Sequence, residues 1–175
     1  MRVIAAQAAI ALSNAQLYAE SERERRMSEA LAAAARAVGE SLRMGEVLRL
    51  ILRHATALLG ADGGGVALLE GDYLHIVSAV GAGELLKGVH LPVYGSVAGR
   101  VVREGTTLIV NDAAHDPNVY RVSRRLANIE KVINVPLATV RGPLGVLSVF
   151  NRAEPFDEAD AVVLRRLADQ SRWPS

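Results

Sequence analysis

Cysteine is absent from the 175 residues of this chain. Its absence excludes disulfide bonds, thiolate metal sites and a cysteine nucleophile, and it favours a reducing compartment such as the cytoplasm. Net charge is nearly absent too, with 20 Lys and Arg against 19 Asp and Glu. A balance this even lacks the basic footprint of a nucleic-acid-binding protein. We therefore expect no nucleic acid as a partner. Long hydrophobic runs are missing as well, so we expect no membrane partner either.

Helix-forming sequence dominates the first part of the chain. Residues 3–38 contain neither proline nor glycine, and this helical pattern continues well past any signal-peptide cleavage site. Apolar residues alternate at spacings of four and three, as in the seam of a coiled coil. This seam consists of Ile4, Ala8, Ala11, Ala15 and Tyr18. Two copies of it would pack together, so we predict a homodimer through one rod whose contact face changes near residues 20–26.

A second helix is expected from Gly45 to Leu59, ending before Gly60. Apolar residues repeat along it at helical spacing, which predicts a stripe buried against the rest of the fold. The predicted stripe consists of Val47, Ile51, Ala55 and Leu58, widened by Leu48 and Leu59.

The segment 131–152 organises the remaining chain. It holds two β-rich runs, Val132–Val140 and Leu144–Phe150, joined by a Gly-Pro turn. Both runs are apolar on both faces, which is typical of strands covered on both sides. We therefore expect this hairpin in the middle of a sheet that lies between two layers.

The order of elements predicts an α+β fold. Consecutive strands joined by hairpins form an antiparallel sheet of five to six strands, and long helices from both ends of the chain cover one face. Loops and a short helix within residues 81–128 must cover the other face. A roof of that kind commonly leaves a cavity, so we expect a ligand pocket there.

No catalytic motif is present, so we expect a non-enzymatic protein. The sequence contains no HExxH, no phosphate-binding glycine pattern and no nucleophile-base order typical of hydrolases. The four histidines, His54, His75, His90 and His115, lack the spacing of metal ligands. The acidic loop 112–118 fits turn chemistry better than a cation site, and Ser96 fits a helix cap better than an anion site.

Four stretches, in order, resemble a GAF domain, a sensory relative of the PAS fold. They are Leu48–Asp62, Leu91–Asp112, the hairpin Val135–Leu147, and Phe156–Asp160. The resemblance implies a GAF domain over residues 42–171, preceded by a linker helix, 1–41, and followed by a tail, 172–175. Residues 1–20 also resemble the closing helix of a preceding GAF domain.

This resemblance implies a sensory module of a cytoplasmic signalling protein, fused to or neighbouring an output domain. Sensor histidine kinases of two-component systems, cyclic-di-GMP enzymes and transcription regulators are typical parents. Two alternatives stay open: a ligand-free spacer that only dimerises and relays, and a haem sensor that uses a strand histidine. Methionine sulfoxide reduction and bilin attachment, both found among GAF domains, require cysteine. Cyclic nucleotides are disfavoured because Asn151, Arg152 and Asp160 match their signature only in part, although an Arg152–Asp160 ion pair is expected.

The identity of the small-molecule ligand is not predicted, but strand parity and loop position indicate where it would bind. The expected pocket residues are His90, Tyr94, Val97, Asp112, Tyr120, Arg124, Asn134 and Ser148.

Overall fold

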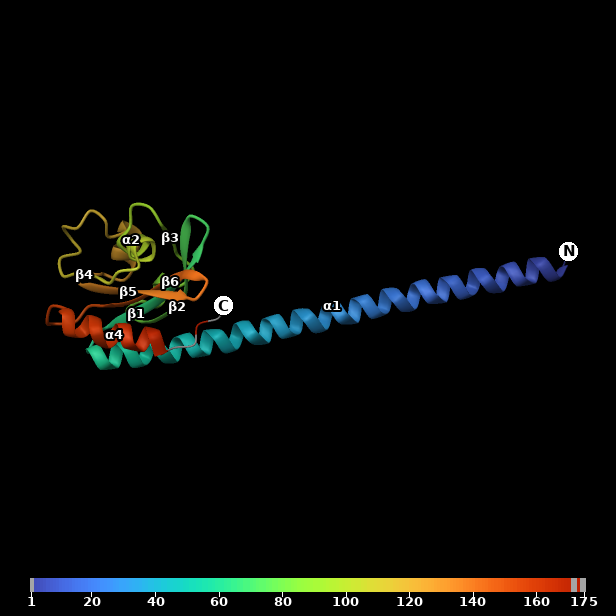
Figure 1. Ribbon diagram of the computed structural model, residues 1–175, viewed down its shortest axis with the longest axis horizontal. Helices are drawn as coiled ribbons and strands as arrows, with labels where there is room; N and C mark the ends of the chain where they lie inside the picture. The colour runs from blue at the N-terminus through green and yellow to red at the C-terminus, as the bar shows by residue number, and fades with distance from the viewer. Residues whose placement is uncertain (1, 171–172, 174–175) are drawn as a thin grey trace. The chain divides into compact units, whose positions relative to one another are not determined.

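The computed structural model describes residues 2–170 and 173 (Figure 1). Its elements are α1 (Arg2–Leu59), β1 (Gly63–Glu70), β2 (Tyr73–Gly81), η1 (Glu84–Leu86), β3 (His90–Pro92), α2 (Val97–Glu104), β4 (Leu108–Val110), α3 (Arg121–Leu126), β5 (Val132–Thr139), β6 (Gly142–Phe150) and α4 (Glu158–Gln170). The chain divides into two compact units, residues 1–44 and 45–175, which are described separately. Among the described residues, no helix combines the length and hydropathy that a membrane span requires.

The second unit is built on one sheet of six strands in the order β3-β2-β1-β6-β5-β4, and every neighbouring pair is antiparallel. Strand β6 pairs with β5 on one side and with β1 on the other. The hairpin of β5 and β6 therefore lies at the middle of the sheet, as its two apolar faces predicted. The predicted α+β architecture is confirmed.

Helical residues 45–59 and α4 cover one face of this sheet (Figure 1). The sheet residues beneath them, Ile133, Val135, Leu147 and Val149, are almost completely buried. From α4, Leu164 packs into the same layer and is 1% exposed. The core is therefore closely packed between the sheet and these helices.

Two details of α1 correct the sequence prediction. Where two helices were expected, the structure has one element, and it includes Gly39 and Gly45. A glycine inside a helix costs only about 1 kcal/mol, which is too little by itself to end one. The buried stripe also differs, because its members are Leu48, Leu52, Ala55 and Leu59. Residues 47–59 are apolar on most sides, so two stripes had suitable spacing and periodicity could not select between them.

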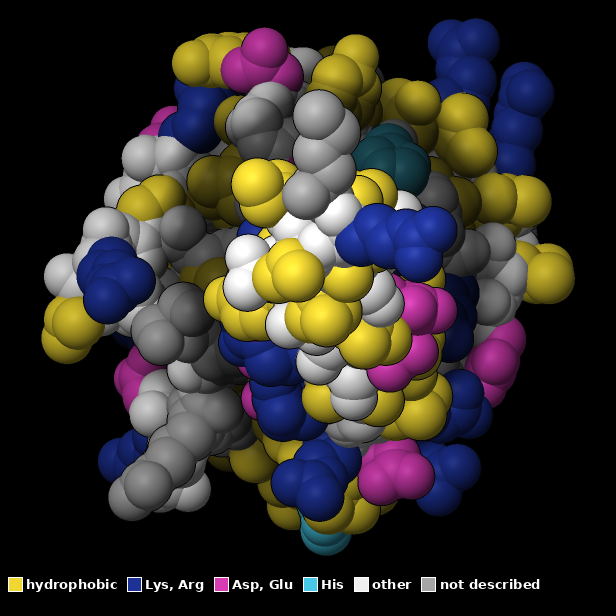
Figure 2. Space-filling view, turned by 90° about the vertical axis from the view of Figure 1, so that its right-hand side faces the viewer, with side chains coloured by type: hydrophobic (Ala, Val, Ile, Leu, Met, Phe, Trp, Pro, Cys, Tyr) yellow, Lys and Arg dark blue, Asp and Glu magenta, His cyan; other side chains and the backbone are white. Residues whose placement is uncertain are grey.

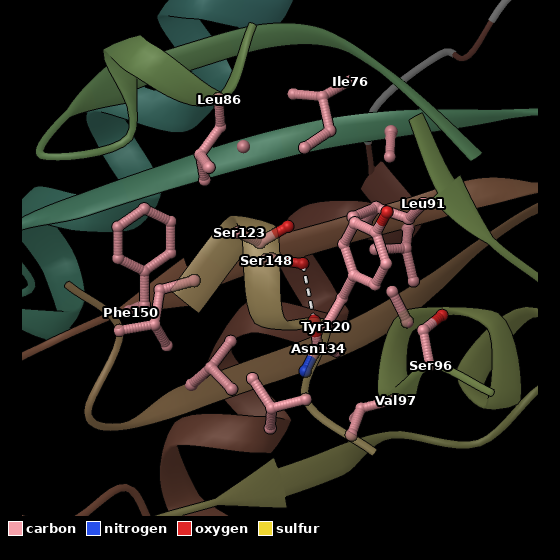
Figure 3. A pocket seen from close by; sticks show the side chains of 17 residues that line it. Ile76, Leu86, Leu91, Ser96, Val97, Tyr120, Ser123, Asn134, Ser148 and Phe150 are labelled. Carbon is pink, nitrogen blue, oxygen red and sulfur yellow. Dashed lines mark hydrogen bonds between the residues drawn. The ribbon is translucent and has the colours of Figure 1, made fainter. Parts of the chain in front are cut away.

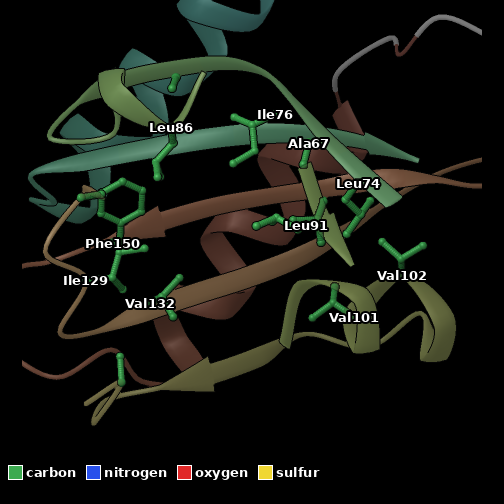
Figure 4. Close-up of a cluster of buried hydrophobic side chains, with 14 of the residues drawn as sticks. Ala67, Leu74, Ile76, Leu86, Leu91, Val101, Val102, Ile129, Val132 and Phe150 are labelled. Atoms are coloured by element: carbon green, nitrogen blue, oxygen red, sulfur yellow. The ribbon is translucent and has the colours of Figure 1, made fainter. Parts of the chain in front are cut away.

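The other face of the sheet is covered by η1, α2, α3 and their loops (Figure 1). Figure 4 shows the apolar cluster beneath them, with Leu86, Ile129 and Phe150 at one end and Leu74, Val101 and Val102 at the other. Gly99 lets α2 approach closely, since a Cβ there would lie 1.9 Å from the carbonyl oxygen of Val93. Ser96 caps α2 as predicted, with its Oγ accepting a hydrogen bond of 3.0 Å from the Gly99 N–H.

The described part of the first unit, residues 2–44, is helix with nearly all side chains exposed. Figure 2 looks onto its N-terminal end and shows hydrophobic side chains standing among Lys, Arg, Asp and Glu. All five residues of the predicted dimer seam are exposed, and Ile4 and Tyr18 are 72% and 70% accessible. The seam therefore packs against nothing within the described chain.

Candidate functional site

A cavity of about 70 Å³ lies between the sheet and its roof of α2, α3 and η1 (Figure 3). Strands β1, β2, β3, β5 and β6 all contribute to its walls. Most of the lining is apolar and includes Ile76, Leu86, Leu91, Val132 and Phe150. None of the described residues that line it is charged.

Asn134 and Ser148 form the polar floor of this cavity. They are direct cross-strand partners on β5 and β6, and the Ser148 hydroxyl donates a 2.6 Å hydrogen bond to Oδ1 of Asn134. Asn134 is only 4% exposed, although it sits in the middle of an apolar sheet. Its amide nitrogen donates to no atom of the described residues, so its N–H groups remain available to a bound molecule.

Ser123 brings a second polar group to the cavity from α3. The residue is 7% exposed, and its hydroxyl has no hydrogen-bond partner among the described residues. A buried hydroxyl without a partner is destabilising by about 1–3 kcal/mol. A ligand or water that accepts a hydrogen bond here would remove that penalty.

The N-terminus of α2 borders the cavity but is already satisfied. The Ser96 hydroxyl donates to the carbonyl oxygen of Pro92 at 2.5 Å, and the Val97 N–H donates to the carbonyl oxygen of Asn118 at 2.8 Å. With the Gly99 N–H also bonded to Ser96, little donor capacity remains for an anion at this end.

Half of the predicted pocket residues line the cavity: Val97, Tyr120, Asn134 and Ser148. The other half lie elsewhere. Tyr94 is 69% exposed, and the guanidinium of Arg103 lies 5.0 Å from its ring centroid. His90 lies on the opposite face of the sheet, because its neighbour Leu91 is the residue that lines the cavity.

Asp112 and Arg124 belong to the loops beside the cavity. Asp112 is exposed and lies 2.9 Å from Nδ1 of His115, and that hydrogen bond is the main cause of its lowered pKa. The guanidinium of Arg124 donates to the carbonyl oxygens of Ala113 and Ala114, at 3.3 and 2.7 Å. Arg124 therefore fixes the loop 113–120 to α3, and it lines a separate polar depression with His115 and Asp116.

A family model described as the GAF domain matches residues 41–171. The chain belongs to the GAF domain family. Among solved structures, the second GAF domain of DevS from Mycobacterium smegmatis is 24% identical, with a TM-score of 0.57 over 71% of this chain and 87% of that one. The free methionine-R-sulfoxide reductase from Neisseria meningitidis is also 24% identical, with a TM-score of 0.58 over 70% of this chain and 74% of that one.

A far-red cyanobacteriochrome photoreceptor is 17% identical, with a TM-score of 0.61 over 84% of this chain and 93% of that one. At these identities the structures share the GAF fold with this chain and nothing more specific. No curated protein matched. GAF domains are in general sensory and signalling modules, and one of the similar structures is nonetheless an enzyme.

Sequence reasoning missed Ser123 as a residue of this GAF pocket. It lies in the short segment RVSRRL, between two irregular loops, where six residues are too few to define a periodic face. The apolar wall formed by Ile76 and Leu91 was also missed, although both residues alternate correctly along their strands. Alternation alone does not distinguish the wall of a cavity from a filled core.

Proposed function

We propose that this GAF domain is a sensory module of a signal-transduction protein, and that its cavity binds a small, uncharged and largely apolar molecule. The observation that carries the proposal is the group formed by Asn134, Ser148 and Ser123 in an otherwise apolar cavity. Pockets of this composition use a few fixed polar groups to orient a ligand whose remaining surface is buried against hydrophobic walls.

The lining restricts the chemistry of the ligand. A charged ligand would find no counter-charge among the described lining residues, and the capped N-terminus of α2 offers little to a phosphate. A neutral molecule with hydrogen-bond acceptors could take donors from Ser123 and from the amide of Asn134. We therefore consider neutral molecules better candidate ligands than cyclic nucleotides.

Haem fits this cavity poorly. None of the described lining residues is a histidine, and the cavity of about 70 Å³ is smaller than the roughly 150 Å³ that accommodates benzene. A ligand of more than a few heavy atoms would require movement of Tyr120 and α3, which form part of the roof. The small volume also favours the second candidate function, a ligand-free GAF spacer.

Arg152 could transmit a displacement of β6 from the cavity to the ends of α1 and α4. It follows the cavity residue Phe150 by two positions, and it donates to the carbonyl oxygen of Leu59 at the end of α1 at 3.1 Å. It also forms an ion pair with Asp160 in the first turn of α4, as the sequence predicted. A ligand that shifts β6 would therefore act on the ends of both helices, provided that it binds two arrangements with different affinity.

The homodimer is part of this proposal, and the exposed side chains of residues 2–44 support it. Val3, Ile10, Leu17, Leu31 and Val38 recur at multiples of seven, and all are 59–69% exposed. One large apolar residue per heptad supplies half of the seam of a left-handed coiled coil. Glu24 occupies the one polar position in this heptad frame. The second seam position, three residues further along, holds Ala6, Ser13, Glu20, Met27, Ala34 and Ser41.

The predicted seam of Ile4, Ala8, Ala11, Ala15 and Tyr18 lies on a different side of the same helix. Ile4, Ala11 and Tyr18 each follow a residue of the heptad frame, and consecutive residues are about 100° apart around a helix.

Thermal unfolding with native mass spectrometry tests the ligand. Neutral molecules of a few heavy atoms, cyclic nucleotides and haem would be added separately to the chain. We expect a neutral molecule to raise the melting temperature and to bind with measurable mass. Ser123→Ala and Asn134→Leu should remove that shift, whereas Ser78→Ala, which alters a buried serine outside the cavity, should keep it. Stabilisation by haem or nucleotides alone would contradict the proposal, and no stabilisation by any of them would favour the spacer.

Sedimentation analysis tests the dimer. We expect the unmodified chain to sediment as a dimer, Leu17→Asp to shift it towards monomer, and Ala15→Asp to leave it a dimer. The reverse pattern would assign the interface to the seam of Ile4, Ala8, Ala11, Ala15 and Tyr18. A monomeric unmodified chain would remove the homodimer from the proposal.

A further inference from the structure

Three potential metal ligands gather on the face of the sheet opposite the cavity. His75 on β2 and His90 on β3 are direct partners in the antiparallel register. Glu70, the last residue of β1, pairs with Tyr73, which lies two positions before His75 on the same strand. Three strands that are adjacent in the sheet therefore place one carboxylate and two imidazoles side by side.

The geometry within this group is close. The two imidazole rings are stacked, with centroids 4.4 Å apart and planes inclined by 7°. Nδ1 of His75 lies 3.1 Å from Oε1 of Glu70. One ligand atom from each residue can be chosen so that all three lie within 4.8 Å of one another. Among the described residues, this is the one set of three or more His and acidic side chains that meets this criterion.

Two imidazole nitrogens and a carboxylate oxygen form a donor set that suits zinc and neighbouring transition metals. Tetrahedral coordination at about 2.0–2.1 Å places donor atoms roughly 3.3 Å apart, so the three side chains must approach one another. The two imidazole rings must also rotate out of their parallel stack, because the nitrogen lone pairs lie in the ring planes. They have room to do so, because Glu70 and His90 are exposed and the side chain of His75 is 31% accessible. The open side of the group leaves a coordination position for water.

We propose that Glu70, His75 and His90 bind one divalent transition metal ion of the zinc class. The two histidines alternate along their strands with Ile76 and Leu91, which line the cavity on the other face. Strand β3 is held to β2 by a register of only three residue pairs. A bound ion would cross-link the two strands and thereby fix one wall of the cavity from behind.

Calorimetric titration of the 175-residue chain, free of any affinity tag, tests this proposal with ZnCl₂ and, separately, NiCl₂. We expect one ion per chain. His75→Ala and His90→Ala should each weaken zinc affinity by at least about tenfold, and Glu70→Gln by a smaller factor. The matched control is His115→Ala, which removes an exposed histidine that also contacts a carboxylate, that of Asp112. This variant should bind zinc as the unmodified chain does.

Cobalt(II) provides a readout that does not depend on heat. The unmodified chain should give the visible absorption of a tetrahedral or five-coordinate site, and the double variant His75→Ala/His90→Ala should not. Unfolding curves of each variant without metal establish that it folds, and Glu70→Gln, at the exposed end of the hairpin, provides a test with little effect on packing. The proposal is overturned if the unmodified chain binds no zinc, or if the folded double variant binds it equally well.

Discussion

The two faces of the sheet differ in how completely they are filled. Beneath helical residues 45–59 and α4, the side chains of Ile133, Leu147 and Val149 are 0% exposed, and Arg152 ties both helices to the end of β6. Beneath α2 and α3, an apolar cluster surrounds a cavity of about 70 Å³. The difference indicates that a deletion on the helix-covered face should lower stability more than a matched deletion on the cavity face.

The largest single loss of stability is expected at Val149, one of two valines on β6 that test the comparison. Val149 faces the helices and Val146 faces the cavity, and both are at most 1% exposed. Val149→Ala should lower the free energy of unfolding by about 2.5 kcal/mol, from lost transfer energy plus a new void. Val146→Ala should cost about 1.6 kcal/mol, close to transfer energy alone, because space already adjoins it. Urea unfolding measures both, and equal losses would contradict the contrast between the faces.

Removing the ion pair should have the next largest effect. Asp160→Asn should lower the free energy of unfolding by about 2 kcal/mol at pH 7, because Arg152 would lose a mostly buried counter-charge. Burial alone would raise the pKa of Asp160. Hydrogen bonds from Arg152 and the backbone N–H of Asp157, with the Coulomb attraction of Arg152, outweigh burial and hold the pKa below its ordinary value of 3.8.

This direction determines the pH dependence. The contribution of Asp160 is fully present well above pH 3.8 and is lost as the pH falls through the lowered pKa of the folded state. The stability gap between the unmodified chain and Asp160→Asn should therefore narrow in acid, as urea midpoints at several pH values would show. Asp112→Asn is the matched control, since Asp112 also has a lowered pKa but is exposed, and it should change stability little. A gap independent of pH would count against this account of the ion pair.

The smallest effect is expected at Ser123. Ser123→Ala removes a hydroxyl that has no partner among the described residues, so the free energy of unfolding should rise, by about 1 kcal/mol. Thermal unfolding without ligand measures this. A loss above 1 kcal/mol would mean that the hydroxyl is already satisfied, for instance by a bound water.

The sequence predicted the sheet better than the site. Apolar residues on both faces of 132–150 placed this hairpin at the centre of the sheet, and strand parity brought Asn134 and Ser148 to the cavity. The same parity placed His90 at the pocket, whereas the cavity takes its neighbour Leu91 instead. Alternation shows which residues share a face, but not which face encloses the cavity.

Loop and helix features were harder to predict for physical reasons. Arg124 bonds to carbonyl oxygens ten and eleven residues away, and such contacts leave no periodic trace in a sequence. Residues 2–44 carry two possible seams, the heptad frame of Val3, Ile10 and Leu17 and the predicted seam through Ala15, and the side chains of both are exposed. Alanine is compatible with almost any helix packing, so the spacing of alanines does not select one face of the helix as the interface.

The two outermost strands, β3 and β4, contain only three residues each. After β4, the side-chain amide of Asn111 exchanges two hydrogen bonds with the backbone of Phe156, at 2.8 and 2.9 Å, as a further strand would. Short edges of this kind give a neighbouring chain little to extend. Copies crowded together in an array should consequently resist strand exchange and fibril growth, so that association is left to surfaces outside the sheet.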